Sequence, residues 1–407
     1  MNKYTITGYG LCLPEIYSTA SLWENLINSN SDFSQDMNII TLEMIERILS
    51  DYPYIPRKKL KHSDLQSIFH FISVKECLEK ANLEFLLDKD EGTIERSKIG
   101  VVSGSMFAQM NFGIKQVSKI VNEHKTNISP YTGMAFYYGA NVGEISCLLK
   151  TRGENCAVLG GTSLVLDGVD VAETMIDFER NDVVLVGGGE NVNYDMIRTS
   201  LMDLNGGNFK NNILPFNKNL KGVRLTNGAA IFSLERTTTA NKRGAHKYAN
   251  ISRPVSVNCL ECTFDMNASL IEAYSQLVDL LLAENNLTKD DITVVIPTGE
   301  SVNTTDYYEA MALQRIFEKR KHFVYTPRSV IGNSMGVSCA VDIITALLMI
   351  EHREVPAFPY VPQLGSEELE NIFVVKRKRN IDVENILIIH KNWTDGKISG
   401  VIVSTPE

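Results

Sequence analysis

The chain has 407 residues, of which 44% are hydrophobic and 22% charged, so it has the composition of a globular protein and the length for two domain-sized cores. Its formal net charge of -9 argues against a nucleic-acid partner, because phosphate binding needs clustered cations. No apolar run is long enough to span a bilayer, and the N-terminus shows no secretory signal, so we expect a protein that stays off the membrane.

Cysteine and histidine placement gives no sign of a metal or redox centre. The seven cysteines are scattered and odd in number, which indicates reduced thiols in a cytoplasmic protein. Cys259 and Cys262 have redox spacing, but no second pair accompanies them. The seven histidines are dispersed and show no ligand spacing. We therefore expect no metal and no cofactor.

The predicted elements, taken in chain order, alternate between strands and helices, which is typical of α/β architecture. After a strand-like alternation at the N-terminus, short runs rich in β-branched residues predict buried strands at 99–103, 157–159, 183–186, 230–234, 292–296 and 386–389. Helical periodicity predicts helices at 65–81, 270–284 and 338–352, and Thr288 with Asp291 fits a capping box.

The two halves of the sequence echo each other in the order of these elements. A polar stretch without periodicity at 236–246 marks the seam, which divides the chain into 1–240 and 241–407. Gly187, Gly188 and Gly189 fit neither a dinucleotide nor a phosphate loop, so we interpret them as a tight turn with Glu190 as a structural group. The cationic runs 57–61 and 376–379 are short and predict solvated loops.

Three segments, in consistent order over nearly the whole chain, carry a family resemblance. They are Leu-Pro-Phe-Asn at 214–217 leading to Leu-Glu at 234–235, Asp-Val-Val-Leu-Val-Gly-Gly-Gly-Glu at 182–190, and Thr-Asp-Tyr-Tyr-Glu-Ala at 305–310. Together they resemble β-ketoacyl synthases. The resemblance implies the thiolase fold, with two pseudo-duplicated βαβαβ halves in a five-layer αβαβα arrangement.

The resemblance also shows which reactive groups this sequence lacks. Condensation in that family uses a cysteine thiolate at a helix N-terminus and two histidines. By comparison with the family, the thiol position falls at or next to Thr162, and the histidine positions fall at Thr298 and Asn333. The family's lysine appears as Arg328, which keeps the cation without a transferable proton. We expect that the chain does not extend acyl chains by itself.

Further segments resemble the ketosynthase-β subunits, or chain-length factors, of type II polyketide synthases. These are Phe-Tyr-Tyr-Gly-Ala-Asn-Val-Gly-Glu-Ile-Ser at 136–146, Leu-Asp-Gly at 166–168, Pro-Thr-Gly at 297–299 and Trp393. The chain departs from that group at Thr162, where glutamine is usual, and at 226–228, where Thr-Asn-Gly replaces Gly-Glu-Gly.

The second resemblance implies that the chain forms a heterodimer with an active ketosynthase. A tunnel between the two subunits would then set polyketide chain length in type II polyketide or aryl-polyene-type biosynthesis. Met110, Gly113, Val117 and Met196 would line the tunnel. Phe136, Tyr137 and Leu159 would lie at the subunit interface. Acyl carrier protein would dock mainly on the ketosynthase, because its acidic surface and this chain repel each other.

Alternative interpretations stay open at this point. Met110, Phe112 and Val117 equally fit a core stripe at helical spacing. The chain could also be a thiolase-fold acyltransferase or thioester hydrolase with a hydroxyl nucleophile such as Thr162, although no base for it is visible. A homodimer that only sequesters acyl carrier protein is a third interpretation.

Overall fold

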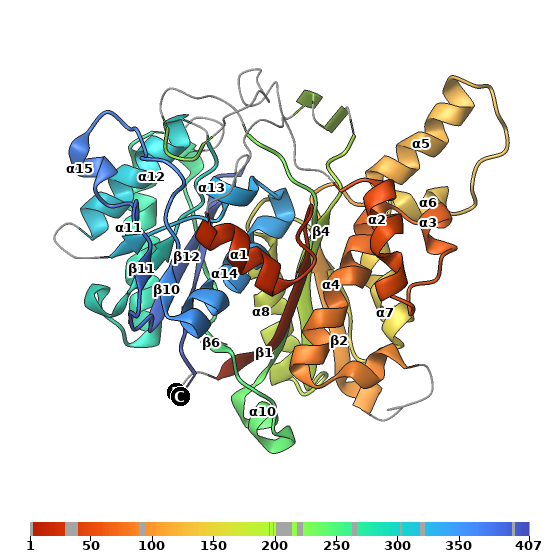
Figure 1. Cartoon of the computed structure of the whole chain (residues 1–407), viewed down its shortest axis with the longest axis horizontal. Helices are drawn as coiled ribbons and strands as arrows, with labels where there is room; N and C mark the ends of the chain where they lie inside the picture. Colours follow the sequence, from red (N-terminus) through yellow and green to blue (C-terminus); the bar gives the residue numbers. More distant parts are fainter. Residues whose placement is uncertain are drawn as a thin grey trace.

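In the computed structural model, one large sheet runs through the molecule between layers of helices (Figure 1). The structure describes residues 3–28, 40–88, 95–194, 196–197, 199–200, 214–217, 223–262, 267–301, 303–317, 322–392 and 395–406.

The sheet consists of two halves with the same strand order. From its outer edge inward the N-terminal half runs β3 (Cys156–Val158), β2 (Ile99–Gly104), β4 (Val183–Glu190), β5 (Gly228–Arg236) and β1 (Tyr4–Cys12). The C-terminal half runs β9 (Phe323–Val324), β8 (Val294–Ile296), β12 (Asn385–Lys391), β13 (Lys397–Ser404) and β6 (Ala249–Ile251), and β7 (Val255–Asn258) also pairs with β13. In each half the first three strands are parallel and the fourth is antiparallel. The predicted duplication is confirmed.

Helices form three layers around these strands. The helices α4 (Leu65–Ala81) and α7 (Ala140–Leu149) cover the outer face of the N-terminal half, and α11 (Ser269–Asn285) and α12 (Asn303–Ile316) cover that of the C-terminal half. Between the two halves lie α8 (Leu164–Asp177), which packs on β4, and α14 (Ser338–His352), which packs on β5 and β12; the two helices also contact each other (Figure 1). This is the five-layer arrangement of the thiolase fold.

Shorter elements connect these layers. They are α1 (Thr19–Asn28), α2 (Leu42–Ile48), α3 (Lys59–His62), α5 (Met110–Val121), α6 (Thr132–Ala135), α10 (Thr237–Arg243), α13 (Arg328–Ile331), α15 (Glu367–Glu370), β10 (Glu354–Val355), β11 (Lys378–Arg379) and the 3-10 turns η1 (Leu49–Asp51), η2 (Glu84–Leu87), η3 (Glu95–Lys98), η4 (Leu260–Cys262), η5 (Lys289–Asp291) and η6 (Met335–Val337). Residues 373–374 run beside β9 and cover its outer edge. The Val374 amide donates to the Val324 carbonyl at 3.1 Å.

The predicted helices are confirmed, and their ends have local causes. Helix α4 begins at Asp64, whose side chain accepts from the Gln66 amide at 3.1 Å, and ends at Asn82, which adopts a left-handed conformation with φ of 55°. The predicted capping box is present, because the Thr288 amide and hydroxyl both donate to Asp291 at 2.7 Å. Helix α14 has the predicted bounds, and α11 is one residue longer at each end.

The glycine run at 187–189 does not form the predicted tight turn. It continues β4 without interruption, paired with β2 and β5. The glycines are required by close packing, because a Cβ on Gly189 would lie 2.0 Å from the His70 ring and one on Gly187 would lie 2.3 Å from the Ala230 carbonyl oxygen. Close approach and a turn produce the same glycine signal in a sequence.

The polar stretch at 236–246 contains a short helix, because α10 occupies Thr237–Arg243 and ends at Gly244 with φ of 68°. One further expectation is corrected. Cys259 and Cys262 are not separate thiols, because their sulfurs are joined in a disulfide across a Cα separation of 5.2 Å. Of the cysteines described, the other five are free.

The helical segment Met335–His352 is long and apolar enough to cross a membrane by length and composition, and 83% of it is buried inside the protein. It packs against both halves of the sheet and against α8, so its apolar side chains belong to the hydrophobic core.

Helix α8 carries a buried carboxyl group in the middle layer. Glu173 is fully buried, its oxygens make no hydrogen bond with any described residue, and its closest cation is the Arg253 Nε at 3.6 Å. Burial raises the pKa of Glu173 from 4.5 to about 8. Between these values the folded chain holds a proton that the unfolded chain has released.

We therefore predict that the free energy of unfolding falls as pH rises from about 5 to about 8. One retained proton contributes a slope of about 1.4 kcal/mol per pH unit. The substitution Glu173→Gln should remove this contribution and raise the melting temperature at pH 8 more than at pH 5, as measured by thermal unfolding. Glu46→Gln, at an exposed carboxylate, should leave the slope unchanged. An identical slope in Glu173→Gln and the parent chain would contradict the prediction.

Candidate functional site

The three positions at which the sequence lacks reactive groups lie in short connections between elements. Thr162 lies between β3 and α8, Thr298 follows β8, and Asn333 lies between α13 and η6, just before α14. All three side chains are buried. Thr162 and Thr298 are brought together by the end of β12: the Thr162 hydroxyl donates to the Lys391 carbonyl at 3.0 Å, and the Lys391 amide donates to the Thr298 hydroxyl at 3.0 Å.

The N-terminus of α8 is capped by a residue from the other half of the chain. Asn392 Oδ1 accepts from the Ser163 amide at 2.9 Å and lies 3.4 Å from the Thr162 hydroxyl. A Cβ on Gly161 would lie 2.5 Å from Asn392 Cγ, so glycine is required for this approach. The free amides of a helix N-terminus can stabilise an anion. Here one of them is already bound to a neutral amide oxygen.

The loop that carries Thr298 is held by two carboxylates of α12. Glu309 accepts from the Thr298 amide at 2.8 Å and the Gly299 amide at 2.9 Å. Asp306 accepts from the Glu300 amide at 2.9 Å and the Ser301 amide at 3.1 Å. These two acids belong to the Thr-Asp-Tyr-Tyr-Glu-Ala segment that carries the family resemblance. Their bonds to four successive amides explain the spacing of that segment, which is structural.

Asn333 is held in place by a separate set of contacts. Its Oδ1 accepts from the Met335 amide at 2.8 Å and the Ser338 hydroxyl at 3.0 Å, and its backbone pairs with that of Leu225. Its Nδ2 is buried and makes no hydrogen bond with a described residue. A carboxamide with this environment has no basic nitrogen, so it cannot accept a proton as an imidazole does.

Arg328 is engaged in a buried ionic cluster. Its Nη2 donates to Asp342 Oδ2 at 2.8 Å, and His390 Nε2 lies 2.6 Å from the same oxygen. Burial lowers the pKa of His390, although Asp342 favours its charged form. No sequence pattern singles out His390 or Asp342, because they lie 48 residues apart. His390 places an imidazole in this region, but its Nε2 is hydrogen-bonded to Asp342.

A second buried pair, Lys391 and Glu300, lies beside Thr298 and was also missed. The Lys391 ammonium donates to the Asn392 carbonyl at 2.6 Å, and burial lowers its pKa. Glu300 is buried, its carboxyl oxygens bond to no described residue, and burial raises its pKa to about 8. The adjoining Asp306 has its pKa raised to about 7, also by burial. None of these three titratable groups is hydrogen-bonded to the Thr162 hydroxyl, whose partners are the backbone carbonyl of Lys391 and the side-chain oxygen of Asn392.

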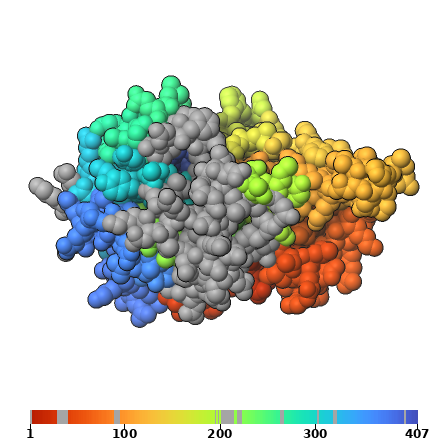
Figure 2. Space-filling model, turned by 90° about the horizontal axis from the view of Figure 1, so that it is seen from above, coloured from red at the N-terminus to blue at the C-terminus, as the bar shows by residue number. Residues whose placement is uncertain are grey.

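A large apolar surface lies beside the open edge of β3. We call it the apolar flank; its exposed residues are Val117, Ile120, Val121, Ile128, Tyr131, Met134, Phe136, Tyr137 and Leu159. Helix α5 contributes in an unusual way, because its buried residues are Asn111, Gly113 and Gln116 while Val117, Ile120 and Val121 are exposed. Figure 1 shows α5 projecting from the side of the molecule above α6, and Figure 2 shows this orange-yellow segment forming one end of the long axis.

The three predicted interface residues and two of the predicted tunnel residues, Gly113 and Val117, lie on or beside the apolar flank. Phe136, Tyr137 and Leu159 are exposed by 45%, 68% and 56%. Gly113 lies against Phe136, whose ring would be 2.8 Å from a Cβ at that position. Val117 is 38% exposed, so it does not belong to a core stripe.

The other two predicted tunnel residues lie elsewhere. Met110 packs against the small core of Val192, Ile197, Val223, Leu225 and Met335, and Met196 is 54% exposed in a helical segment after β4. Trp393 and Gly222 lie outside the described residues. Among the residues that the structure describes, no group of three or more His, Cys, Asp or Glu side chains is arranged to hold a metal ion.

Two family models match most of the chain. That of the β-ketoacyl synthase N-terminal domain matches residues 1–240, and that of the C-terminal domain matches residues 255–361. The chain is 23% identical to 3-oxoacyl-[acyl-carrier-protein] synthase 1 of Buchnera aphidicola subsp. Schizaphis graminum, over 91% of this chain and 90% of that protein. It is 23% identical to the tetracenomycin polyketide synthase ketoacyl synthase beta subunit of Streptomyces glaucescens, over 94% of both chains.

Solved structures with the same fold include the ishigamide ketosynthase/chain length factor, with a TM-score of 0.82, 16% identity and full coverage of both chains. A type II polyketide synthase acyl carrier protein in complex with its ketosynthase, bound to the hexaketide, also matches with a TM-score of 0.82, 17% identity and full coverage. The two halves of the fold, the positions of Thr162, Thr298 and Asn333, and the match of both family models lead to one conclusion: the chain belongs to the β-ketoacyl synthase family.

Proposed function

We propose that the chain is a non-catalytic ketosynthase-like subunit, a chain-length factor, that pairs with an active β-ketoacyl synthase in a cytoplasmic type II polyketide or aryl-polyene-type system. The observation that carries the proposal concerns the three positions at which the family has its cysteine and its two histidines. Thr162, Thr298 and Asn333 stand in an intact thiolase framework, and each is hydrogen-bonded within the chain. We place the division between the two halves near residue 240.

The local chemistry supports a lack of condensing activity. A hydroxyl nucleophile needs an adjacent base, and the Thr162 hydroxyl instead donates to a backbone carbonyl. Stabilisation of an oxyanion needs amides aimed at the developing charge, and the Ser163 amide is already bound to Asn392. The cation of Arg328 is bound to Asp342. The nucleophile, the oxyanion donor and the cation each have an internal partner.

The apolar flank supports a protein partner. Exposed apolar side chains that gather in one region of a soluble protein often mark an interface. Strand β3 adds a free edge, because among the described strands it pairs only with β2. A free strand edge beside an apolar surface favours pairing with another chain. We propose that the partner is the active ketosynthase and that acyl carrier protein docks mainly on that partner.

The tunnel assignment follows from the same surface. With a partner on the flank, Gly113 and Val117 of α5 would face the junction between the subunits. Met110, which packs against the core containing Met335, would lie deeper and nearer Asn333, and Met196 would contribute from the segment after β4. Because the side chains at these positions are small or flexible, we propose a tunnel that accommodates a long chain.

Charged substitutions on the flank should prevent pairing. We predict that Leu159→Asp or Phe136→Asp weakens the complex with the co-expressed ketosynthase at least about 30-fold, since a buried charge at an interface centre costs 2 kcal/mol or more. Native mass spectrometry should show a one-to-one heterodimer for the parent chain and free subunits for these variants. Leu260→Asp and Phe178→Asp are matched controls, because these side chains are 80% and 70% exposed away from the flank. A heterodimer that survives Leu159→Asp and Phe136→Asp would contradict the proposed interface.

Val117 allows a separate test of the tunnel. We predict that Val117→Trp leaves the heterodimer intact and shifts its product to a shorter chain by at least one two-carbon unit, because the larger side chain fills part of the tunnel. Liquid chromatography with mass spectrometry of the reconstituted system measures the product length. Leu260→Trp should leave the product unchanged. The tunnel assignment is wrong if both variants give the parent product.

Thr162 discriminates the proposed role from that of a hydroxyl acyltransferase or hydrolase. We predict that the purified chain acquires no acyl group when it is incubated with an acyl thioester of acyl carrier protein, as measured by intact-protein mass spectrometry. The active ketosynthase under the same conditions should gain the acyl mass. An adduct on this chain that disappears in Thr162→Ala would replace our proposal with the enzymatic one.

A further inference from the structure

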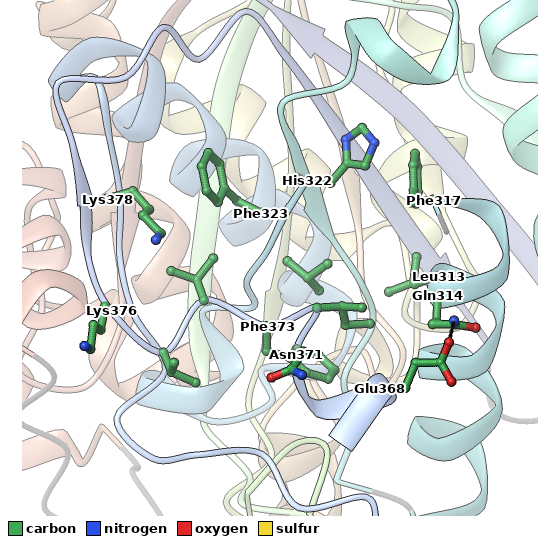
Figure 3. A pocket seen from close by; sticks show the side chains of 14 residues that line it. Leu313, Gln314, Phe317, His322, Phe323, Glu368, Asn371, Phe373, Lys376 and Lys378 are labelled. Atoms are coloured by element: carbon green, nitrogen blue, oxygen red, sulfur yellow. Dashed lines mark hydrogen bonds between the residues drawn. The ribbon is translucent and has the colours of Figure 1, made fainter. Parts of the chain in front are cut away.

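A pocket of about 660 Å³ lies at the opposite edge of the sheet from the apolar flank. Edge strand β9, the end of α12 and the segment 371–378 surround it (Figure 3). It shares no lining residue with the Thr162 region or with the apolar flank. Its volume falls in the range of about 300–1,000 Å³ that is usual for small-molecule sites.

The walls of the pocket are mainly aliphatic and aromatic. Leu313 and Phe317 come from α12, Phe323 and Val324 from β9, and Ile372 and Phe373 from the segment that follows α15. Figure 3 shows Phe323 and Phe373 between Lys376 and Lys378 on one side and Gln314 and Glu368 on the other. Such a surface favours a ligand with an apolar body, because burial of each CH₂ group contributes about 0.8 kcal/mol.

The positive charge at one end has a simple origin in strand geometry. Successive side chains of an extended segment point to opposite sides. Arg377 and Arg379 both point to Glu354, with Arg377 Nε donating to its carboxylate at 2.8 Å. Lys376 and Lys378 point to the other side and line the pocket. Half of the cationic run predicted as a solvated loop is therefore ion-paired, and the other half faces the pocket.

The two lysines have no ion pair with any residue that the structure describes. The Lys378 ammonium lies 5.7 Å from the centre of the Phe323 ring, which holds it over the apolar wall. At the opposite end Gln314 donates to Glu368 at 2.7 Å (Figure 3). The pocket is positive at one end and has a carboxylate at the other, so an anionic group fits only beside the lysines.

We propose that this pocket binds a small amphipathic monocarboxylate, with the carboxylate beside Lys376 and Lys378 and the apolar tail against Phe323, Phe373 and Leu313. The charge separation and the depth of the apolar walls favour such a molecule over an acidic peptide, which would need cations along its whole length. The site is separate from the proposed pairing with a ketosynthase and does not depend on it.

The test uses the full chain and isothermal titration calorimetry with three probes: decanoate below its micellar concentration, 1-decanol and acetate. Decanoate should bind saturably at one site per chain. Acetate should not bind, because it lacks the tail, and 1-decanol should bind at least about fivefold more weakly than decanoate, because it lacks the charge.

Variants localise the binding. Lys376→Ala/Lys378→Ala should weaken decanoate binding about fivefold to twentyfold and leave 1-decanol binding unchanged. Val375→Glu, at a half-exposed position in the lining, should weaken decanoate binding by repulsion. The control Lys58→Ala/Lys242→Ala removes two exposed lysines elsewhere, so it changes the net charge equally.

Three outcomes would overturn the proposal. They are the absence of saturable decanoate binding, equal affinity in the pocket variants and the control, and capture at this pocket of an acidic carrier protein but not of decanoate.

Discussion

The end of β12 joins the two halves of the molecule, and the rest of the site depends on that junction. Residues 389–392 belong to the C-terminal half, yet the Lys391 carbonyl and the Asn392 side chain bind the start of α8 in the N-terminal half. The same short stretch accepts from Thr298 through the Ile389 carbonyl and donates to it through the Lys391 amide. Any movement of β12 would therefore change the surroundings of Thr162 and Thr298 together.

These contacts explain how the fold of a condensing enzyme stays stable in a chain that lacks the reactive side chains. Unpaired amides at a helix start and buried acids without cations both cost stability. In this chain Asn392 satisfies an amide of α8, and Asp306 and Glu309 satisfy the amides around Thr298. A cap of this kind contributes about 1 kcal/mol, so the arrangement stabilises the fold at the place where an enzyme would keep donors unpaired for its substrate. The titratable groups Glu300 and Lys391 remain, buried and without a direct ion pair.

Sequence patterns predicted the elements well where one physical cause dominates. The period of 3.6 residues located α4, α11 and α14 because each buries one face in a continuous core. Patterns failed where two causes give the same signal: the glycines at 187–189 suit a turn or a close approach, and the polar stretch at 236–246 suits a linker or a solvated helix. Comparison with the family located Thr162, Thr298 and Asn333. Lys391 and Asn392 could not be found that way, because they contact Thr162 across 229 and 230 residues and their roles depend on the tertiary contact.

The duplicated sheet has two outer edges, and they differ in a way that limits assembly. At β9 the backbone of 373–374 already occupies the outer hydrogen-bonding positions, whereas β3 has neighbours on one side only. A chain with two open edges could add copies at both ends and grow into a fibre. With the β9 edge covered, this chain offers a free strand edge only at β3 among the strands that the structure describes, so strand pairing with another chain would be limited to that one side.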